Sequence, residues 1–341
     1  MLIRRHSSGY NFIGDTETGV TLRWGATSEQ DPVLAPWPEL ADISISNHCS
    51  KNCDFCYRDS KPDNSFMSLA DYESVLDSLT SPQWGSVFQV ALGGGEPLEH
   101  PEFIEIIQRT WERGIVANFT TNGRGVTKEL AAEIAGKVGA VALSASSIDD
   151  IQPERVKILV DAGIKTNIHY ILDSNSIEQA AEILEGRYNY MLADVNAVIF
   201  LTFKPRGRGT EAGCLTPGAA LDRFVSRIDS TACCAHIGFD ACFVPILMRQ
   251  TKVNVDYVDS CECAFFSIYI DEQRNVKPCS FATGNRDSFN LQQYSMEEIW
   301  TQHFSVYRKG LLDSPCSEDC QHSSSCHGKC AYFESLAFCY Q

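Results

Sequence analysis

Short apolar runs rich in β-branched residues alternate along this chain with longer segments whose apolar residues recur every three to four positions. The first pattern predicts strands with buried side chains, and the second predicts amphipathic helices. Between residues 41 and 203 we expect six strands, at 41–46, 87–92, 115–121, 140–146, 165–172 and 196–203. Five helices are expected between them, at 68–79, 101–114, 127–139, 153–163 and 176–187, with Gly114, Gly139 and Gly163 at helix ends.

Repeated strand–helix–strand units build a parallel sheet with right-handed crossovers. We expect an α/β fold, a partial parallel (β/α)6 barrel, although periodicity alone does not distinguish a barrel from an open sheet. In either geometry, ligands bind at the carboxyl ends of the strands. The loops after the first four expected strands contain three cysteines, LGGGEP, TTNG and SASS. The sequence therefore predicts one site along this edge of the sheet.

Composition and charge narrow the class of protein. A chain of 341 residues with 44% apolar content can bury a sizeable core. The net charge of -16 argues against nucleic acid as the main ligand, because such proteins cluster Lys and Arg against phosphates. We find no secretion signal and no apolar run near the ~20 residues that cross a bilayer. We therefore expect a cytoplasmic protein that binds neither nucleic acid nor membrane.

Fifteen cysteines are many for a cytoplasmic chain, where thiols stay reduced, so metal binding is the first expectation. Three of them, Cys49, Cys53 and Cys56, directly follow the first expected strand. A structural zinc site needs four ligands, and His48 is a candidate for the fourth. A 4Fe-4S cluster also usually takes four cysteines, so three leave one iron open to bind something else. The residues alone leave both metals open.

The spacing of these cysteines, with Phe55 before the third and the run Gly94, Gly95, Glu96 and Pro97 after the second strand, resembles the radical S-adenosylmethionine (SAM) enzymes. The resemblance covers residues 41 to roughly 205. It implies that the open iron binds the methionine moiety of SAM, and that an electron from the cluster yields a 5'-deoxyadenosyl radical, which abstracts hydrogen from a substrate.

The same resemblance implies a set of cofactor-binding residues, namely Phe55, Gly94, Gly95, Glu96, Asn122 and Ser144. Glycine suits this role because it lets the backbone approach a ligand closely. The alternative for the glycine run is a tight turn between a strand and a helix.

The cysteine-rich C-terminal stretch resembles the SPASM domain, an extension of radical SAM enzymes that holds auxiliary iron-sulfur clusters. The matching features are a hairpin that ends in VKPC at Cys279, a following GN, and a helical SMEEIW. The resemblance implies one or two auxiliary 4Fe-4S clusters. Their ligand sets would be Cys261, Cys263, Cys279 and Cys330 for the first, and Cys316, Cys320, Cys326 and Cys339 for the second.

Three features depart from the SPASM pattern. Three residues, not two, separate Cys316 from Cys320, and Arg274 stands where the family has glycine. One residue between Cys261 and Cys263 is tight for two ligands of one cluster, so one auxiliary cluster could lack a fourth protein ligand. The alternative for this stretch is a pair of zinc sites.

Four cysteines, Cys214, Cys233, Cys234 and Cys242, belong to neither pattern. Most free cysteines behave as small buried hydrophobes. The sharper hypothesis is that one of them, with Cys214 and Cys234 as candidates, donates a hydrogen atom to a substrate radical at the mouth of the barrel.

The segment KPRGRGTE places Lys204, Arg206 and Arg208 after the sixth strand of an otherwise acidic chain. A basic cluster there would suit a carboxylate on cofactor or substrate. The alternative is a solvated loop.

We expect residues 1–40 to form an N-terminal hairpin and linker, 41–225 the radical SAM core, 226–260 a bridging region, and 261–341 the auxiliary domain. The favoured substrate is a ribosomally synthesised peptide that undergoes crosslinking, epimerisation or oxidation, because SPASM extensions occur most often on peptide maturases. A flavodoxin or ferredoxin is the expected reducing partner. The alternatives are a dehydrogenase, decarboxylase or epimerase of a small metabolite and, in another class, a zinc-stabilised binding protein without turnover.

Overall fold

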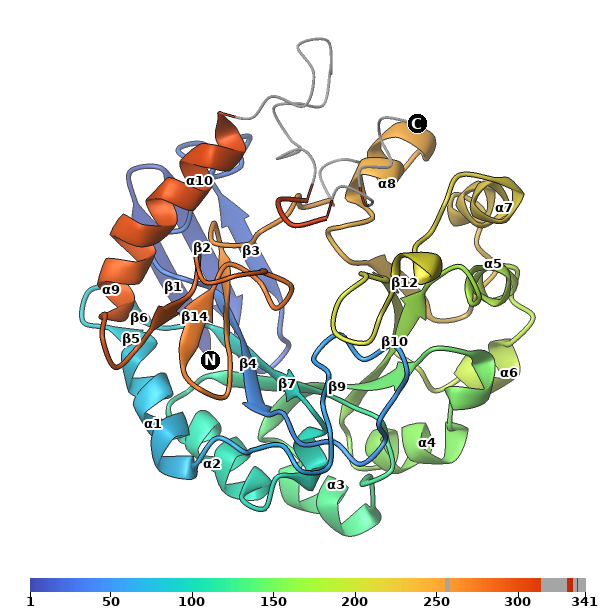
Figure 1. Cartoon of the computed structure of the whole chain (residues 1–341), viewed down its shortest axis with the longest axis horizontal. Coiled ribbons are helices and arrows are strands. Elements are labelled where there is room, and N and C mark those ends of the chain that lie inside the picture. Colours follow the sequence, from blue (N-terminus) through green and yellow to red (C-terminus); the bar gives the residue numbers. More distant parts are fainter. Residues whose placement is uncertain (255–257, 314–329, 334–335, 337–341) are drawn as a thin grey trace.

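The computed structural model describes residues 1–254, 258–313, 330–333 and 336, and it has a curved, mostly parallel sheet with helices outside it (Figure 1). Seven neighbouring strands run parallel in the order β12 (His236–Phe239), β11 (Ala197–Thr202), β10 (Lys165–Leu172), β9 (Val138–Ala145), β8 (Val116–Thr121), β7 (Gln89–Gly94) and β4 (Leu40–Ser46). Six of these confirm the predicted strands. The seventh, β12, was missed because its four residues HIGF are too short and too exposed to give a pattern.

Helices cover the outer side of this sheet, as Figure 1 shows for α1 to α6. The five predicted helices are α1 (Leu69–Ser78), α2 (Phe103–Glu112), α3 (Lys128–Ile134), α4 (Pro153–Asp161) and α5 (Ile177–Leu184). Further helices are α6 (Asn189–Leu192), α7 (Ala219–Ile228) and α8 (Val244–Gln250), with 3-10 turns at η1 (Pro97–Glu99), η2 (Ile148–Asp150) and η3 (Glu211–Gly213). The βαβ order predicted for the core is therefore confirmed.

One predicted helix end was wrong. Helix α3 stops at Ile134, and Gly139 lies inside β9. A Cβ at Gly139 would come within 2.5 Å of the Val116 side chain and 2.6 Å of Asn118, so the glycine lets neighbouring strands approach. Gly136, with φ of +74°, follows the helix end instead.

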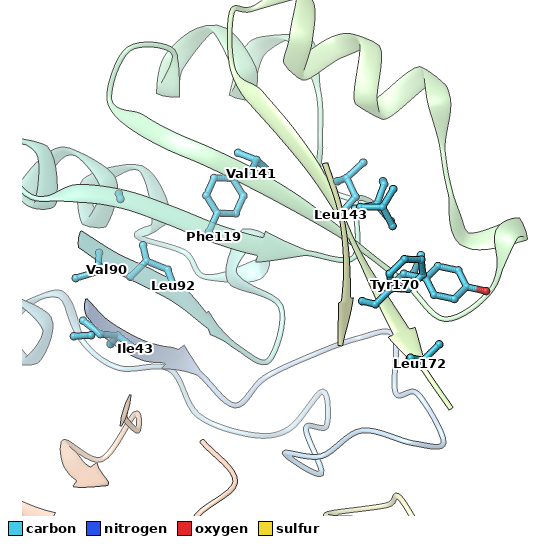
Figure 2. Packing of buried hydrophobic residues seen from close by; sticks show 14 of the residues in the cluster. Ile43, Val90, Leu92, Phe119, Val141, Leu143, Tyr170 and Leu172 are labelled. Carbon is cyan, nitrogen blue, oxygen red and sulfur yellow. The ribbon is translucent and has the colours of Figure 1, made fainter. Parts of the chain in front are cut away.

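The two faces of the sheet differ in chemistry because side chains alternate along each strand. The outward residues are apolar and pack beneath the helices; Figure 2 labels Ile43, Val90, Leu92, Phe119, Val141, Leu143, Tyr170 and Leu172. The alternate residues face the inside of the curve, and many of them are polar, namely Asp42, Ser44, Gln89, Asn118, Thr120, Ser144, Asn167 and His169. A polar inner lining suits a ligand site more than a packed core.

The predicted auxiliary hairpin is confirmed, and it extends the same sheet. Strand β13 (Ser267–Ile270) pairs parallel with β4, and β14 (Asn275–Lys277) and β15 (Phe289–Asn290) follow antiparallel. The predicted helical SMEEIW opens α9 (Met296–Glu298), a π-helical turn (Ile299–His303) and α10 (Phe304–Leu312). Within the described residues β12 and β15 end the sheet without pairing, so the barrel is open.

The chain begins with a separate antiparallel sheet of β1 (Leu2–Ser7), β2 (Tyr10–Asp15) and β3 (Thr21–Trp24). The predicted hairpin is β2 and β3, and β1 is an additional strand. A small hairpin, β5 (Thr80–Ser81) and β6 (Gly85–Ser86), lies between α1 and β7. Across the described part of the chain, no helix has the length and apolar character needed to cross a membrane. The proposed domain boundaries stay a prediction.

Candidate functional site

The three-cysteine loop leaves β4 and crosses the carboxyl ends of several strands. It is held at its start by the Cys49 amide, which donates to the Lys61 carbonyl at 3.2 Å. Farther on, Lys51 pairs with Asp150 at 3.5 Å, and Asp150 lies just beyond the end of β9. Cys49, Cys53 and Cys56 are all half-buried. The loop therefore presents its thiols at the edge where the sequence predicted a site.

His48 is committed to a contact other than metal binding. Its Nε2 lies 3.2 Å from the Glu99 carboxylate, which also accepts from the Ser50 amide at 2.9 Å. Among the described residues, no group of three or more His, Cys, Asp or Glu side chains is arranged to hold a single metal ion. A zinc site built from His48 and the three cysteines would have to break the contact between His48 Nε2 and Glu99 if that nitrogen were the ligand.

Arg208 clamps the cysteine loop from the segment after β11. Its Nε donates to the Cys53 carbonyl at 2.7 Å, and its Nη1 donates to the Ser60 carbonyl at 3.0 Å and to Asp59 at 2.8 Å. Its backbone amide also donates to the Cys56 carbonyl at 3.0 Å. Arg208 thus fixes the backbone that carries the thiols, while its buried Nη2 has no partner among the described residues.

Gly207 makes this clamp possible. It has φ of +63°, and a Cβ there would lie 2.3 Å from the Cys56 carbonyl oxygen. Only glycine tolerates that conformation at such close approach. The glycine between two arginines was visible in the sequence, but its contact could not be deduced before the loops were placed together.

The glycine run after β7 serves mainly to pack against the β4 segment. A Cβ on Gly94 would lie 2.1 Å from the Ser46 carbonyl oxygen, and one on Gly95 would lie 1.9 Å from that of His48. The amides of Gly95 and Glu96 donate to these same oxygens at 2.7 and 2.8 Å. Gly94 and Gly95 therefore let the end of β7 pack against the backbone that leads into the cysteine loop, and the cofactor contact expected of them stays a prediction.

Gly93 differs from the two glycines that follow it. Its Cβ position faces open space, and its partner across the ladder is Ser44 on the inner face. If a ligand contacts the strand end directly, Gly93 is the position with room for it. The sequence motif did not distinguish the three glycines, because only the fold shows which way each one faces.

Glu96 is buried, and protein groups occupy its carboxylate. It accepts from Thr121 Oγ1 at 2.6 Å, from the Asn122 amide at 2.8 Å and from the Leu98 amide at 3.1 Å. Burial raises the pKa of Glu96, and these three hydrogen bonds oppose the rise. Glu96 therefore holds the loop after β8 in place, and the cofactor contact expected of it stays a prediction.

Asn122 has the free donor that a ligand site requires. Its Oδ1 accepts from the Arg124 amide at 2.9 Å, whereas its buried Nδ2 has no partner among the described residues. A buried donor without a partner costs about 1–3 kcal/mol, so such groups are rare without a reason. Asn122 therefore fits a carboxylate or hydroxyl acceptor of a bound cofactor.

Ser144 and His169 lie side by side on the inner face, paired across β9 and β10. His169 Nδ1 lies 3.1 Å from Thr120 Oγ1, and burial lowers the pKa of His169 to about 4, so the imidazole is neutral at pH 7. Phe55 is half-buried in the cysteine loop. The cofactor contacts predicted for Ser144 and Phe55 stay predictions.

A second site lies between the barrel and the C-terminal segment. A cavity of ≈270 Å³ is lined by all four cysteines predicted for the first auxiliary cluster, Cys261, Cys263, Cys279 and Cys330. The Cys263 thiol hydrogen-bonds the thiols of Cys261 and Cys279. The cavity, walled by thiols and apolar side chains, therefore fits an iron-sulfur cluster. The second predicted set, Cys316, Cys320, Cys326 and Cys339, lies outside the described residues.

The two cysteine sites share a wall. The Tyr57 ring, next to Cys56, lies 4.7 Å from the Phe281 ring, centroid to centroid, and its hydroxyl bonds Ser280, next to Cys279. Arg58 pairs with Glu272 in the hairpin turn. The cysteine loop is therefore joined directly to the auxiliary hairpin.

The cysteines outside both patterns occupy three different places. Cys234 is exposed just before β12, at the amino ends of the strands, where its thiol contacts the Asn189 carbonyl at 3.6 Å. A hydrogen donor at the barrel mouth would have to lie at the carboxyl ends of the strands, so Cys234 is at the opposite end. Cys233, the preceding residue, is at that end as well. Cys214 lies at the correct edge, but it is 5% exposed. Cys242 lines the auxiliary cavity.

Comparison with known proteins agrees with this geometry. Residues 43–186 match the model of the radical SAM superfamily. Mycofactocin maturase MftC of Mycobacterium tuberculosis is 25% identical over 331 residues, covering 88% of this chain and 78% of that protein. PqqA peptide cyclase of Streptomyces rochei is 22% identical over 318 residues, covering 84% and 83%.

Two solved structures have the same fold. The crystal structure of Streptococcus suis SuiB bound to precursor peptide SuiA has a TM-score of 0.68 at 14% identity and covers 98% of each chain. The structure of anSMEcpe with bound AdoMet has a TM-score of 0.64 at 17% identity, covering 88% of this chain and 87% of that one. The partial barrel and the added hairpin are therefore found together in other proteins.

Proposed function

We propose, from the match of residues 43–186 to the radical SAM superfamily, that this chain is a radical SAM enzyme that abstracts hydrogen from a ribosomally synthesised precursor peptide during its maturation. The observation that carries the proposal is the meeting, at one edge of the sheet, of the three-cysteine loop and the unpartnered Nδ2 of Asn122. A 4Fe-4S cluster with SAM, bound there, supplies a 5'-deoxyadenosyl radical.

The protein's own part is to bind and orient. Cys49, Cys53 and Cys56 would hold the cluster, and Asn122 would donate to SAM, with Ser144 and Phe55 nearby. Burial raises the pKa of the Cys49 thiol, and hydrogen bonds from the amides of Lys51 and Asn52 oppose that rise. Arg208 and Glu96 act one step away, because they hold the loops that carry these groups.

The substrate class is supported by the relatives. One is named a mycofactocin maturase, another a PqqA peptide cyclase, and a structural neighbour was solved with a precursor peptide. The electron for SAM cleavage must come from outside the chain, and we propose a flavodoxin or ferredoxin as its source. One or two auxiliary 4Fe-4S clusters complete the proposal, with Cys261, Cys263, Cys279 and Cys330 as candidate ligands of the first.

The radical step is tested by replacing Cys53 with alanine. We expect the anaerobically reconstituted, reduced wild type to form 5'-deoxyadenosine, and we expect Cys53→Ala to form none while it retains auxiliary iron. Cys234→Ala, at the opposite end of the barrel, is the matched control and should keep full SAM cleavage. Colourless wild-type protein that binds zinc and leaves SAM intact would contradict the proposal.

The substrate class needs a separate test. Short peptides encoded beside the gene are incubated with the reduced enzyme and SAM, and their masses are compared with controls lacking SAM. We expect a SAM-dependent mass change in one peptide. SAM turnover without any change in such peptides would exclude them and direct the search to small metabolites.

A further inference from the structure

Five thiols, not four, line the auxiliary cavity within the described residues. The fifth is Cys242, in the segment after β12, and it lies in the same ≈270 Å³ cavity as the four predicted ligands. A 4Fe-4S cluster takes four thiolates. One of the five thiols is therefore not needed as a ligand, and the geometry of the cavity indicates which one.

Cys261 and Cys263 are poorly placed to bind two corners of one cluster. Only Glu262 separates them, and their thiols hydrogen-bond each other. The backbone beyond Glu262 is fixed, because the Glu262 carbonyl accepts from the Phe265 and Phe266 amides at 2.9 Å each. This tight turn limits how far the two thiols can separate, so the pair suits one ligand position more than two.

Cys242 comes to the cavity with a buried cation beside it. The Lys204 side chain, 5% exposed, hydrogen-bonds the Cys242 thiol and pairs with Asp240. Asp240 is fixed in turn, because it accepts from the Thr202 amide at 3.2 Å and from Thr202 Oγ1 at 2.7 Å. The buried Lys204 ammonium, just after β11, is therefore held beside the Cys242 thiol.

Burial raises the pKa of the Cys242 thiol, and the adjacent Lys204 ammonium opposes that rise, so the lysine would offset the negative charge of a Cys242 thiolate bound to iron. Lys204 also lies over the Phe281 ring, with Nζ 4.8 Å from the centroid, so its position is fixed from the auxiliary side as well. No described contact connects Lys204 to the three-cysteine loop or to the inner face near Asn122. Among the described contacts, the Lys204 charge therefore acts on groups that line the auxiliary cavity.

We propose that Cys242 is an iron ligand of the first auxiliary cluster, together with Cys279, Cys330 and one of the pair Cys261 and Cys263. Binding replaces the S–H bond of Cys242 by an S–Fe bond, and the proton leaves to water. Lys204 is a positioning residue that keeps this thiolate in place. The inference rests on the proposed function, because it requires an auxiliary cluster to be present.

The test uses full-length chains that carry Cys49→Ala, Cys53→Ala and Cys56→Ala, so that only auxiliary iron remains. Each chain is reconstituted anaerobically, and iron, sulfide and the electron paramagnetic resonance spectrum after mild oxidation are measured. Adding Cys242→Ala should remove iron or produce the signal of a three-iron cluster. Of the two further variants Cys261→Ala and Cys263→Ala, only one should have this effect. The control Cys234→Ala should change neither the iron content nor the spectrum.

The outcomes separate the two levels of the proposal. If Cys242→Ala leaves iron and spectrum unchanged while both Cys261→Ala and Cys263→Ala alter them, Cys242 is not a ligand. If the parent chain holds no iron, the auxiliary cluster is absent and the inference about Cys242 fails, whereas the radical SAM step is decided separately by 5'-deoxyadenosine formation in the wild type. A circular dichroism spectrum and a melting temperature of Cys242→Ala that match those of the parent chain show that the variant folds.

The role of Lys204 is tested by the midpoint potential of the auxiliary cluster, which depends on nearby charge. Lys204→Met should lower the midpoint potential of the auxiliary cluster, because removing a nearby positive charge disfavours the reduced state. Lys204→Arg should restore most of the shift. An unchanged potential in Lys204→Met would remove the lysine from the proposal.

Discussion

The thiols of the three-cysteine loop come from eight consecutive residues, 49–56, whereas those of the auxiliary cavity come from positions 242, 261, 263, 279 and 330. The loop is held by hydrogen bonds to its backbone, from Arg208 and from the segment at Lys61. The cavity is different, because its thiols come from segments that lie far apart in the chain. The first site is thus encoded locally, and the second is assembled by the fold.

The largest expected effect tests how rigidly the loop is held. Gly95→Ala should destabilise the protein by about 3 kcal/mol, because its Cβ would lie 1.9 Å from the His48 carbonyl oxygen. Thermal unfolding checks this, with Gly93→Ala as the matched control because its Cβ would meet open space. Equal melting temperatures for the two variants would show that the loop is not rigidly held.

A somewhat smaller effect is expected at the clamp. Arg208→Met removes charged hydrogen bonds to the carbonyls of Cys53 and Ser60 and should weaken the loop by about 2 kcal/mol. We expect poor iron loading at the first site and normal loading at the auxiliary one, measured by iron content and by 5'-deoxyadenosine yield. Arg227→Met, on the surface of α7, is the control. Loss of iron from both sites alike would mean that the two are not held independently.

The smallest expected effect concerns the unpartnered amide. Asn122→Ala should weaken SAM binding by about tenfold because it removes the unpartnered Nδ2 donor, and it should lower the melting temperature only slightly because the one bond lost is that of Oδ1 to the Arg124 amide. Equilibrium dialysis of the holoenzyme measures this. Asn196→Ala, at the amino end of the barrel, serves as the control. Unchanged SAM affinity in Asn122→Ala would place the cofactor elsewhere along the edge.

The same contrast explains which features could be predicted from the sequence. The six core strands and the three-cysteine loop follow local patterns, so they were found at nearly their observed positions. The direction that Gly94 and Gly95 face, and the protein donors to Glu96, depend on how separate loops meet. No local pattern contains that information.

The auxiliary cavity shows most clearly which features the sequence alone does not predict. The four predicted cysteines were grouped through a family resemblance, and the structure brings them to one cavity. Cys242 carried no motif, because its neighbours in the cavity are far away in the chain. Arg274 was noted as a substitution for glycine, and it indeed has φ of +65°, which is costly for a non-glycine residue. Its ion pair with Asp71 at 2.6 Å fixes the turn to α1.

The parallel pairing of β13 with β4 has a consequence for how the protein is made. Strand β4 ends at residue 46 and its neighbour begins at residue 267, so this pairing closes a very long loop. Such contacts form late, because chain entropy opposes them. Until then the β4 edge is bare and ready to pair with another chain. We expect synthesis in the cell to be most prone to aggregation before the C-terminal third has emerged, and chaperones to matter most in that interval.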